Sequence, residues 1–128
     1  MRVLIDTHTL LWAVTGDRRL SSRAQETMES FATEVFVSAA SAWEICTKHR
    51  LGKLPEAEAL VGNLSSILGQ LGFRELAISL KHAERAGTLP GEHRDPFDRM
   101  LIAQAQTENL SLISNDRFFD QYGITRIW

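Results

Sequence analysis

Cysteine is nearly absent from this sequence, since Cys46 is the only one in 128 residues. An intramolecular disulfide is therefore excluded, and we expect Cys46 to pack inertly in a helix in a reducing compartment, the cytoplasm. The length makes up for this, because a chain of this size buries roughly two thirds of the surface that its unfolded form exposes. We expect one domain over residues 1–128 without a structural zinc.

Long hydrophobic runs are also missing. The apolar stretches are far shorter than the roughly 20 residues of a membrane span, so no association with a membrane is expected. The start of the chain, MRVLIDTH, reaches an acid after three apolar residues. A signal peptide has a longer apolar core. The sequence therefore predicts a soluble protein.

An excess of positive charge is missing as well, because the formal net charge is −2. A broad basic surface for nucleic acid is thereby excluded, and any such contact has to come from local patches. The four histidines do not have the ligand spacing of a zinc site; they are His8, His49, His82 and His93.

What the sequence does have is a regular alternation of short apolar strands with helices. Strands are predicted over residues 3–5, 35–37, 73–78, 110–113 and 124–127, and helices over residues 9–14, 22–32, 39–50, 56–70, 79–87 and 96–109. This order indicates an α/β fold whose central, mostly parallel sheet is covered by helices on both faces.

Four acidic residues occupy positions where such a fold binds ligands. Asp6 ends the first strand, and Asp116 follows the strand over residues 110–113. Glu44 lies in the second turn of the helix after the second strand, and Asp98 lies at the start of a helix. Ligands of open parallel sheets bind beyond the carboxyl ends of the strands, so the four acids are predicted to converge there.

Three of these acids also have a purely structural interpretation. Asp6 and Asp116 are suited to cap the helices that follow them. Glu44 precedes Lys48 by four residues, the favourable orientation for an ion pair on an exposed helix face. From their local sequence alone, these residues do not establish a site.

Asp98 is more informative. Near a helix start an acid favours the helix dipole, which accounts for its charge. It does not account for the helix face, because Asp98 shares a stripe with Leu101, Ile102 and Ala105. A carboxylate on the buried side needs a charged partner. A hard cation such as Mg²⁺ or Mn²⁺ would be that partner, and it would activate water and neutralise charge at a phosphate.

At these residues the chain resembles a known family. Four segments, in the family's order across about residues 2–127, are similar to PIN domains, specifically the VapC-type toxins of type II toxin–antitoxin systems: LIDTHTLLWA, SAASAWEI, HRDPFDRMLIAQA and LISNDRFF. The resemblance implies a three-layer α/β/α sandwich and an endoribonuclease that depends on Mg²⁺ or Mn²⁺.

The resemblance also implies roles for individual residues. The family's four acids fall on Asp6, Glu44, Asp98 and Asp116 as catalytic residues and metal ligands. Asp6 and Asp98 are the first choices as direct ligands and Asp116 follows, whereas Glu44 either binds a second ion or orients the attacking water.

Several neighbouring residues are expected to support the acids. Thr7, Ser114 and Asn115 are candidates to hold the carboxylates by hydrogen bonds. Asp95 either joins the site through water or caps its helix.

The expected partners are an RNA and an inhibitory protein. Arg94, Arg99 and Arg117 each neighbour a proposed site acid and, with Lys48, are candidates to hold RNA phosphates, or else ion-pair partners. The first two helices are rich in apolar residues, and any part left exposed would form a groove for a partner helix. The resemblance implies a VapB-like antitoxin there, and a homodimer of the toxin.

Two other functions compete with ribonuclease activity. A phosphatase of the haloacid-dehalogenase type needs a second Asp two residues after the first, where this chain has His8. The other alternative is a catalytically silent PIN-like module that binds RNA or protein, and the presence of all four acids argues against it.

Overall fold

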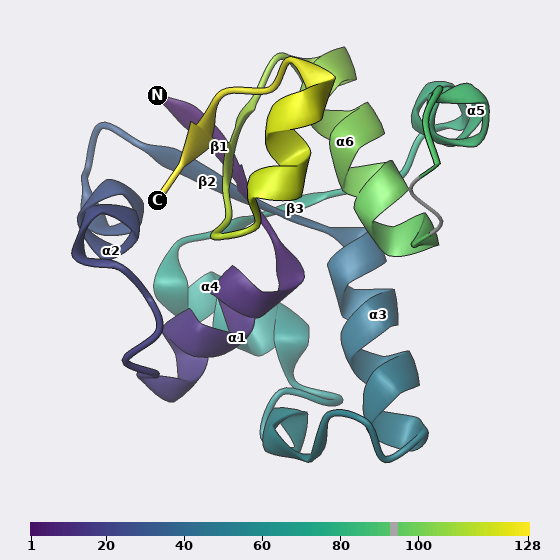
Figure 1. Ribbon diagram of the computed structural model, residues 1–128. Helices are drawn as coiled ribbons and strands as arrows, with labels where there is room; N and C mark the ends of the chain where they lie inside the picture. Colours follow the sequence, from purple (N-terminus) through teal and green to yellow (C-terminus); the bar gives the residue numbers. More distant parts are fainter. Residues whose placement is uncertain (93–94) are drawn as a thin grey trace.

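The structure, a computed structural model, describes residues 1–92 and 95–128 (Figure 1). Within these residues five strands form one sheet in the order β3-β2-β1-β4-β5, and each neighbouring pair runs parallel. The strands are β1 (Arg2–Ile5), β2 (Glu34–Ser38), β3 (Arg74–Leu76), β4 (Ser111–Ile113) and β5 (Arg126–Ile127).

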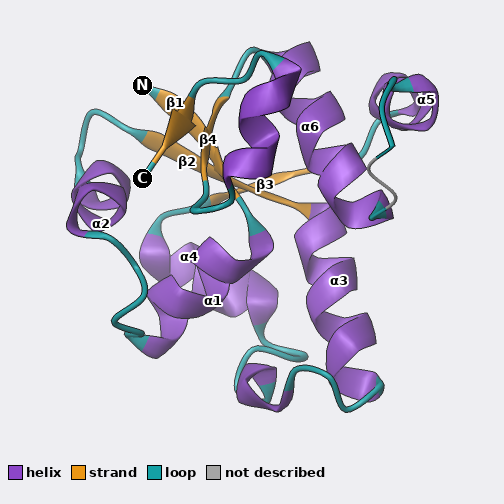
Figure 2. Cartoon of the chain, viewed as in Figure 1, coloured by secondary structure: helices purple, strands orange, loops and turns teal. Residues whose placement is uncertain are grey.

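Helices cover both faces of this sheet (Figure 2). They are α1 (Thr7–Thr15), α2 (Ser22–Glu29), α3 (Ala39–Arg50), α4 (Leu64–Leu71), α5 (Leu80–Thr88) and α6 (Pro96–Glu108), with 3₁₀ turns η1 (Pro55–Ala57) and η2 (Arg117–Tyr122). The predicted α/β sandwich with a parallel central sheet is thereby confirmed. None of the described helices has both the length and the apolar character needed to cross a membrane.

The alternation of side chains along β1 divides the core into two layers. Val3 and Ile5 pack in a cluster with residues of α1, α2 and α4, whereas Leu4 belongs to a second cluster on the opposite face with Leu101 and Ile102 of α6. All five side chains are at most 1% exposed. Because β1 lies at the centre of the sheet and is covered on both faces, its carboxyl end is held rigidly.

Serine caps define several helix starts. The side chain of Ser21 accepts from the Ala24 N–H, and that of Ser38 accepts from the Ala40 N–H. Ser79 and His82 form a reciprocal capping box at the start of α5. These caps satisfy backbone N–H groups that have no partner inside the helix.

The single helix predicted over residues 56–70 is wrong. The chain instead forms η1, then turns, and begins α4 only at Leu64. Gly62 in the turn has a φ of 81°, a left-handed conformation that ends helical geometry. The strand predicted over residues 73–78 shortens to β3, because only Phe36–Ser38 of β2 pairs with it, and the last strand shortens to residues 126–127.

Candidate active site

A hollow of about 530 Å³ is lined by residues of α1, α3, α6 and the segment that follows β4. Its acidic residues are Asp6, Glu44, Asp95, Asp98 and Asp116. Its basic residues are His8, Arg19, Lys48 and Arg117, and the remaining lining residues are Thr7, Trp12, Asn115 and Phe119. All four acids predicted from the sequence therefore line one hollow.

Asp6 stands where β1 passes into α1. Its Oδ1 accepts from the Thr9 N–H at 2.8 Å, which caps α1, and its Oδ2 accepts from the Ser114 hydroxyl. The residue is only 7% exposed. Burial raises the pKa of Asp6, although the hydrogen bonds from Ser114 and Thr9 act in the opposite direction. Asp6 is therefore both the N-cap of α1 and an acid of the hollow.

Ser114 connects the ends of β1 and β4. Besides donating to Asp6, its Oγ accepts from the Asp116 N–H at 3.0 Å, and the residue is fully buried. Asp116 in turn caps η2 by accepting from the Phe118 N–H at 2.9 Å. The prediction that Asp116 caps a short helix is confirmed, and its side chain still lines the hollow.

Glu44 forms the ion pair with Lys48 that its spacing predicts, but the pair does not lie on an exposed face. The Glu44 side chain is 5% exposed and that of Lys48 is 32% exposed. Oε1 of Glu44 accepts from the Thr7 hydroxyl at 2.5 Å, and Oε2 accepts from the Lys48 ammonium. Glu44 is therefore a buried acid of the hollow whose two oxygens already have donors.

The ammonium of Lys48 lies in the field of several acids. Its partial burial alone would lower the pKa of Lys48, but the hydrogen bond to Glu44 and the charges of Glu44, Asp95 and Asp98 outweigh that effect and raise it. The ammonium is thus held in its charged form by the acids around it.

The two acids of α6 differ in their contacts. Oδ1 of Asp95 accepts from the Phe97 N–H at 2.9 Å and from the Asp98 N–H at 3.3 Å, so Asp95 is the helix cap. Asp98 lies one turn further and is half-buried at the hollow. Leu101 and Ile102 continue into the core behind it.

The predicted basic contacts are only partly brought together. Arg117 and Lys48 line the hollow. Arg99 does not lie among the described lining residues: its guanidinium donates to the carbonyl groups of Ala86 and Leu89 on another side of α6. The RNA contact proposed for Arg99 is therefore not supported by its position. Arg94 lies outside the residues that the structure describes.

Two basic residues that line the hollow, Arg19 and His8, were missed by the sequence reasoning. Arg19 places its guanidinium carbon 4.9 Å from the ring centroid of Trp12, and His8 lies 5.8 Å from the same ring. His8 carried a signal, since it follows Asp6 and Thr7 on the first turn of a helix. No sequence pattern indicated Arg19, because only the turn after α1 places it beside the hollow.

The donor chemistry of the hollow fits a hard cation, because carboxylate oxygens are the ligands that Mg²⁺ and Mn²⁺ prefer. Within the described residues, however, no three His, Cys, Asp or Glu side chains are arranged so that they would hold a metal ion together. Hydrogen bonds account for part of this arrangement: both oxygens of Asp6 and both oxygens of Glu44 accept from groups of the chain itself.

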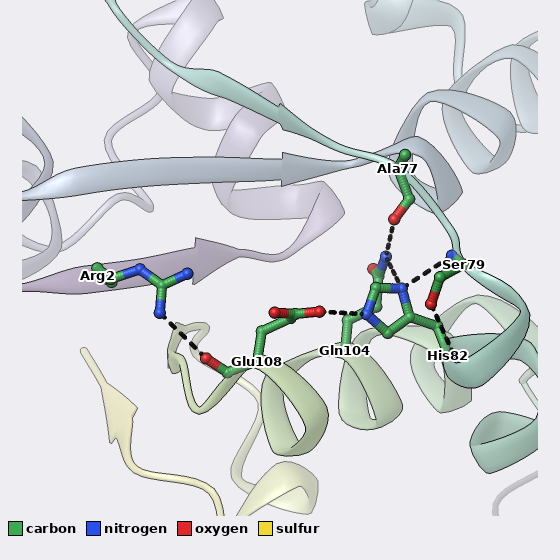
Figure 3. Close-up of polar contacts among 6 residues, drawn as sticks. All are labelled: Arg2, Ala77, Ser79, His82, Gln104 and Glu108. Carbon is green, nitrogen blue, oxygen red and sulfur yellow. Dashed lines mark hydrogen bonds and ion pairs between the residues drawn. The ribbon is translucent and has the colours of Figure 1, made fainter.

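A second buried polar cluster has a structural role (Figure 3). Nδ1 of His82 accepts from the Ser79 N–H at 3.0 Å, and Nε2 lies 2.8 Å from Oε1 of Glu108. Gln104 reaches the carbonyl of Ala77 at 3.3 Å, and Arg2 donates to the carbonyl of Glu108. The cluster ties the start of α5 to the C-terminal half of α6, away from Asp98.

A further hollow, of about 630 Å³, lies beside α1 and α2. Its lining includes Trp12, Leu20, Met28, Phe31 and Phe73. Leu10 and Leu11 of α1 are core, whereas Phe31, two residues after the end of α2, is fully exposed. An apolar surface therefore remains at the position where a partner groove was expected.

The parallel five-stranded sheet and the acidic hollow beside its central strand make this an α/β sandwich with a candidate site at the carboxyl end of β1. The sequence matches the PIN domain family over residues 3–124, and the chain belongs to that family. No curated protein sequence matches it significantly.

Solved structures of low sequence identity share this fold. DNA-bound VapBC from Salmonella typhimurium is similar with a TM-score of 0.69 and 16% identity, covering 98% of this chain and 96% of that chain. FitAcB from Neisseria gonorrhoeae has a TM-score of 0.67 and 18% identity, and the match covers 98% of this chain and 96% of that chain. VapC20 from Mycobacterium tuberculosis, a Sarcin-Ricin loop cleaving toxin, has a TM-score of 0.66 and 16% identity, and the match covers 96% of each chain.

Proposed function

We propose that this PIN domain is a divalent-metal-dependent endoribonuclease, the toxin of a type II toxin–antitoxin pair, which hydrolyses RNA phosphodiester bonds. The observation that carries the proposal is the hollow in which Asp6, Glu44, Asp98 and Asp116 meet basic side chains. Acids alone would repel a phosphate, and bases alone would bind it without hydrolysis. Their combination suits a site that holds both a cation and a polyanion.

The metal ion, Mg²⁺ or Mn²⁺, would be held by Asp6, Asp98 and Asp116. It would activate the attacking water and neutralise the charge that builds on the phosphate and the leaving oxygen. Glu44 is the fourth acid, serving either a second ion or the attacking water. The support for Asp6 is its burial, since a buried carboxylate is stabilised in its charged form by a nearby cation.

The chain's own residues would position the substrate and the acids. Ser114 and the Thr9 N–H hold the two oxygens of Asp6, so this carboxylate keeps one orientation. Arg117 and Arg19 line the same hollow and would bind the phosphates on either side of the cleaved bond. Because the net charge is −2, binding of RNA would depend on these local cations.

Cleavage by the purified, partner-free chain tests this function. RNA should be cut with Mg²⁺ or Mn²⁺ and not in chelator, and Asp6→Asn and Asp98→Asn should each lower the rate at least about 100-fold, or about 2.7 kcal/mol in the barrier. Glu84→Gln is the matched control, because Glu84 is an exposed acid of α5 that is not among the described residues lining the hollow. Cleavage that persists in chelator or in both variants would refute the mechanism. RNA binding without cleavage would indicate the silent module instead.

The partner that fits the second hollow is a helix of a VapB-like antitoxin. Phe31 is fully exposed at this hollow, and Leu20, half-buried just before α2, and Met28, largely buried within α2, line it beside Phe31. An apolar helix face would bury these side chains. Such an antitoxin would also inhibit by placing a basic side chain among the acids of the neighbouring site, which Trp12 joins to this hollow.

Growth assays test the toxin role. Expression of the chain should arrest growth, and co-expression of a short neighbouring open reading frame should relieve the arrest. Size-exclusion chromatography of the chain alone tests the homodimer. Arrest that Asp6→Asn does not prevent would argue against a toxin that acts by cleavage.

A further inference from the structure

Glu44 differs from Asp6 in the charge of one of its donors, because an ammonium donates to Glu44 whereas a hydroxyl and a backbone N–H donate to Asp6. Thr7 of α1 donates to its Oε1 and Lys48 of α3 donates to its Oε2, and the Thr7 hydroxyl also lies 3.1 Å from the Ser41 hydroxyl. The carboxylate is therefore surrounded by donors of its own chain. One of these donors carries a full positive charge, which is what a metal ion would otherwise supply to a buried carboxylate.

Glu44 cannot be left without a cation, because a buried and unpaired carboxylate is costly. Two cations compete for this role: the Lys48 ammonium and a divalent ion. The ammonium already holds Oε2, and its positive charge would repel a divalent ion at close range. The ammonium has the advantage of being tethered one helical turn away on α3.

We propose that Lys48 takes the place of a second metal ion at Glu44, so that the site binds one divalent ion through the other acids. This inference rests on the proposed metal site, and it decides between the two roles left open for Glu44. The Glu44–Lys48 ion pair then has no net charge, and its ammonium remains at the hollow.

The position of Lys48 supports more than a structural ion pair. An i, i+4 pair on a helix surface has both partners in water and contributes little. Here the ammonium lines the hollow and lies in the field of Asp95 and Asp98 as well as Glu44. The neighbouring His49 points elsewhere, because it pairs with the exposed Glu58. Lys48 is thus the cation of the last turn of α3 that faces the acids.

Titration calorimetry with Mn²⁺ on the purified full chain tests the inference. Lys48→Met removes the ammonium and keeps the length of the side chain, so Glu44 becomes available and Mn²⁺ should bind about tenfold or more tighter, or with a second ion. Lys48→Arg keeps the charge and should bind one ion as the wild type does.

The decisive variant is Glu44→Gln with Lys48→Met, which replaces the ion pair by two neutral side chains of similar size. A buried ion pair replaced in this way is often tolerated, so the double variant lacks the unpaired buried carboxylate that the single variant leaves at Glu44. The double variant should bind Mn²⁺ with the stoichiometry of the wild type and an affinity within about threefold of it. The gain seen in Lys48→Met should therefore disappear.

Three outcomes overturn the inference. If the double variant binds Mn²⁺ much more weakly than the wild type, Glu44 is a metal ligand in the native site. If Lys48→Met folds and binds as the wild type does, the ammonium does not block the metal. If no variant binds Mn²⁺, the proposed metal site itself is wrong and this inference falls with it, which separates the two failures.

Discussion

The hydroxyl of Ser114 is expected to contribute strongly to stability, because it donates to the buried carboxylate of Asp6. A hydrogen bond to a charged group contributes about 1.5–3 kcal/mol. The second bond of Ser114, from the Asp116 N–H, lies nearer the surface and adds less. Ser114→Ala should therefore lower the free energy of unfolding by about 2–3 kcal/mol at neutral pH, and lower Tm by roughly 10 °C.

The loss of stability in Ser114→Ala should depend on pH, and the pKa of Asp6 determines whether it grows or shrinks as pH rises. Burial raises the pKa of Asp6 above its ordinary value of 3.8. The folded chain keeps this proton where the unfolded chain has lost it, so the free energy of unfolding falls as pH rises from 3.8 through the folded pKa. Loss of the Ser114 hydroxyl raises the pKa of Asp6 further. Ser114→Ala should therefore destabilise more at neutral pH than in acid.

Urea denaturation followed by circular dichroism, in chelator, measures both effects at about pH 5 and about pH 7.5. Ser66→Ala is the matched control, because Ser66 is exposed in α4, and its effect should stay within about 0.5 kcal/mol. In an Asp6→Asn background the pH dependence of Ser114→Ala should vanish. A cost below about 0.5 kcal/mol, or one that is equal at both pH values, would refute the reasoning.

Three further predictions concern other parts of the chain. Gly62→Ala should lower the free energy of unfolding by about 1 kcal/mol in urea denaturation, because the φ of Gly62 is 81°; a gain in stability would instead indicate a helix there. His82→Ala should destabilise by about 2–4 kcal/mol without changing RNA cleavage per folded molecule, and a loss of cleavage would contradict the separation of the two polar clusters. Phe31→Ser should leave unfolding within about 0.5 kcal/mol, because Phe31 is fully exposed, yet weaken antitoxin binding in calorimetry; unchanged binding would rule out the proposed groove.

Much of the secondary structure was predictable because the determining interactions are local. Ser21, Ser38, Ser79 and Asp95 cap helices through backbone N–H groups two or three residues away. The helix over residues 56–70 was not predictable in this way. Its apolar spacing is helical on both sides of Gly62, and the spacing does not report the left-handed turn between them.

The candidate acids were identifiable for a similar reason, since three of them lie near the end of a strand or the start of a helix and Glu44 lies in the second turn of α3. Thr7 and Ser114 were also candidates to hold carboxylates, but which acid each of them holds was not predictable. Thr7 reaches Glu44 across 37 positions, and Ser114 reaches Asp6 across 108 positions. Such contacts depend on the order of the strands, which places β4 beside β1.

The sequence by itself determined the alternation of strands and helices, the caps, and the presence of four acids at positions suited to a site, because these depend on residues a few positions apart. Only the tertiary structure decided which neighbours each acid has. It places the Glu44–Lys48 pair and Arg19 at the lining of one hollow. It also places Arg99 where its guanidinium donates to the carbonyl groups of Ala86 and Leu89. The physical reason is that burial and long-range pairing arise only when the sheet assembles and α1, α3 and α6 meet beside its central strand.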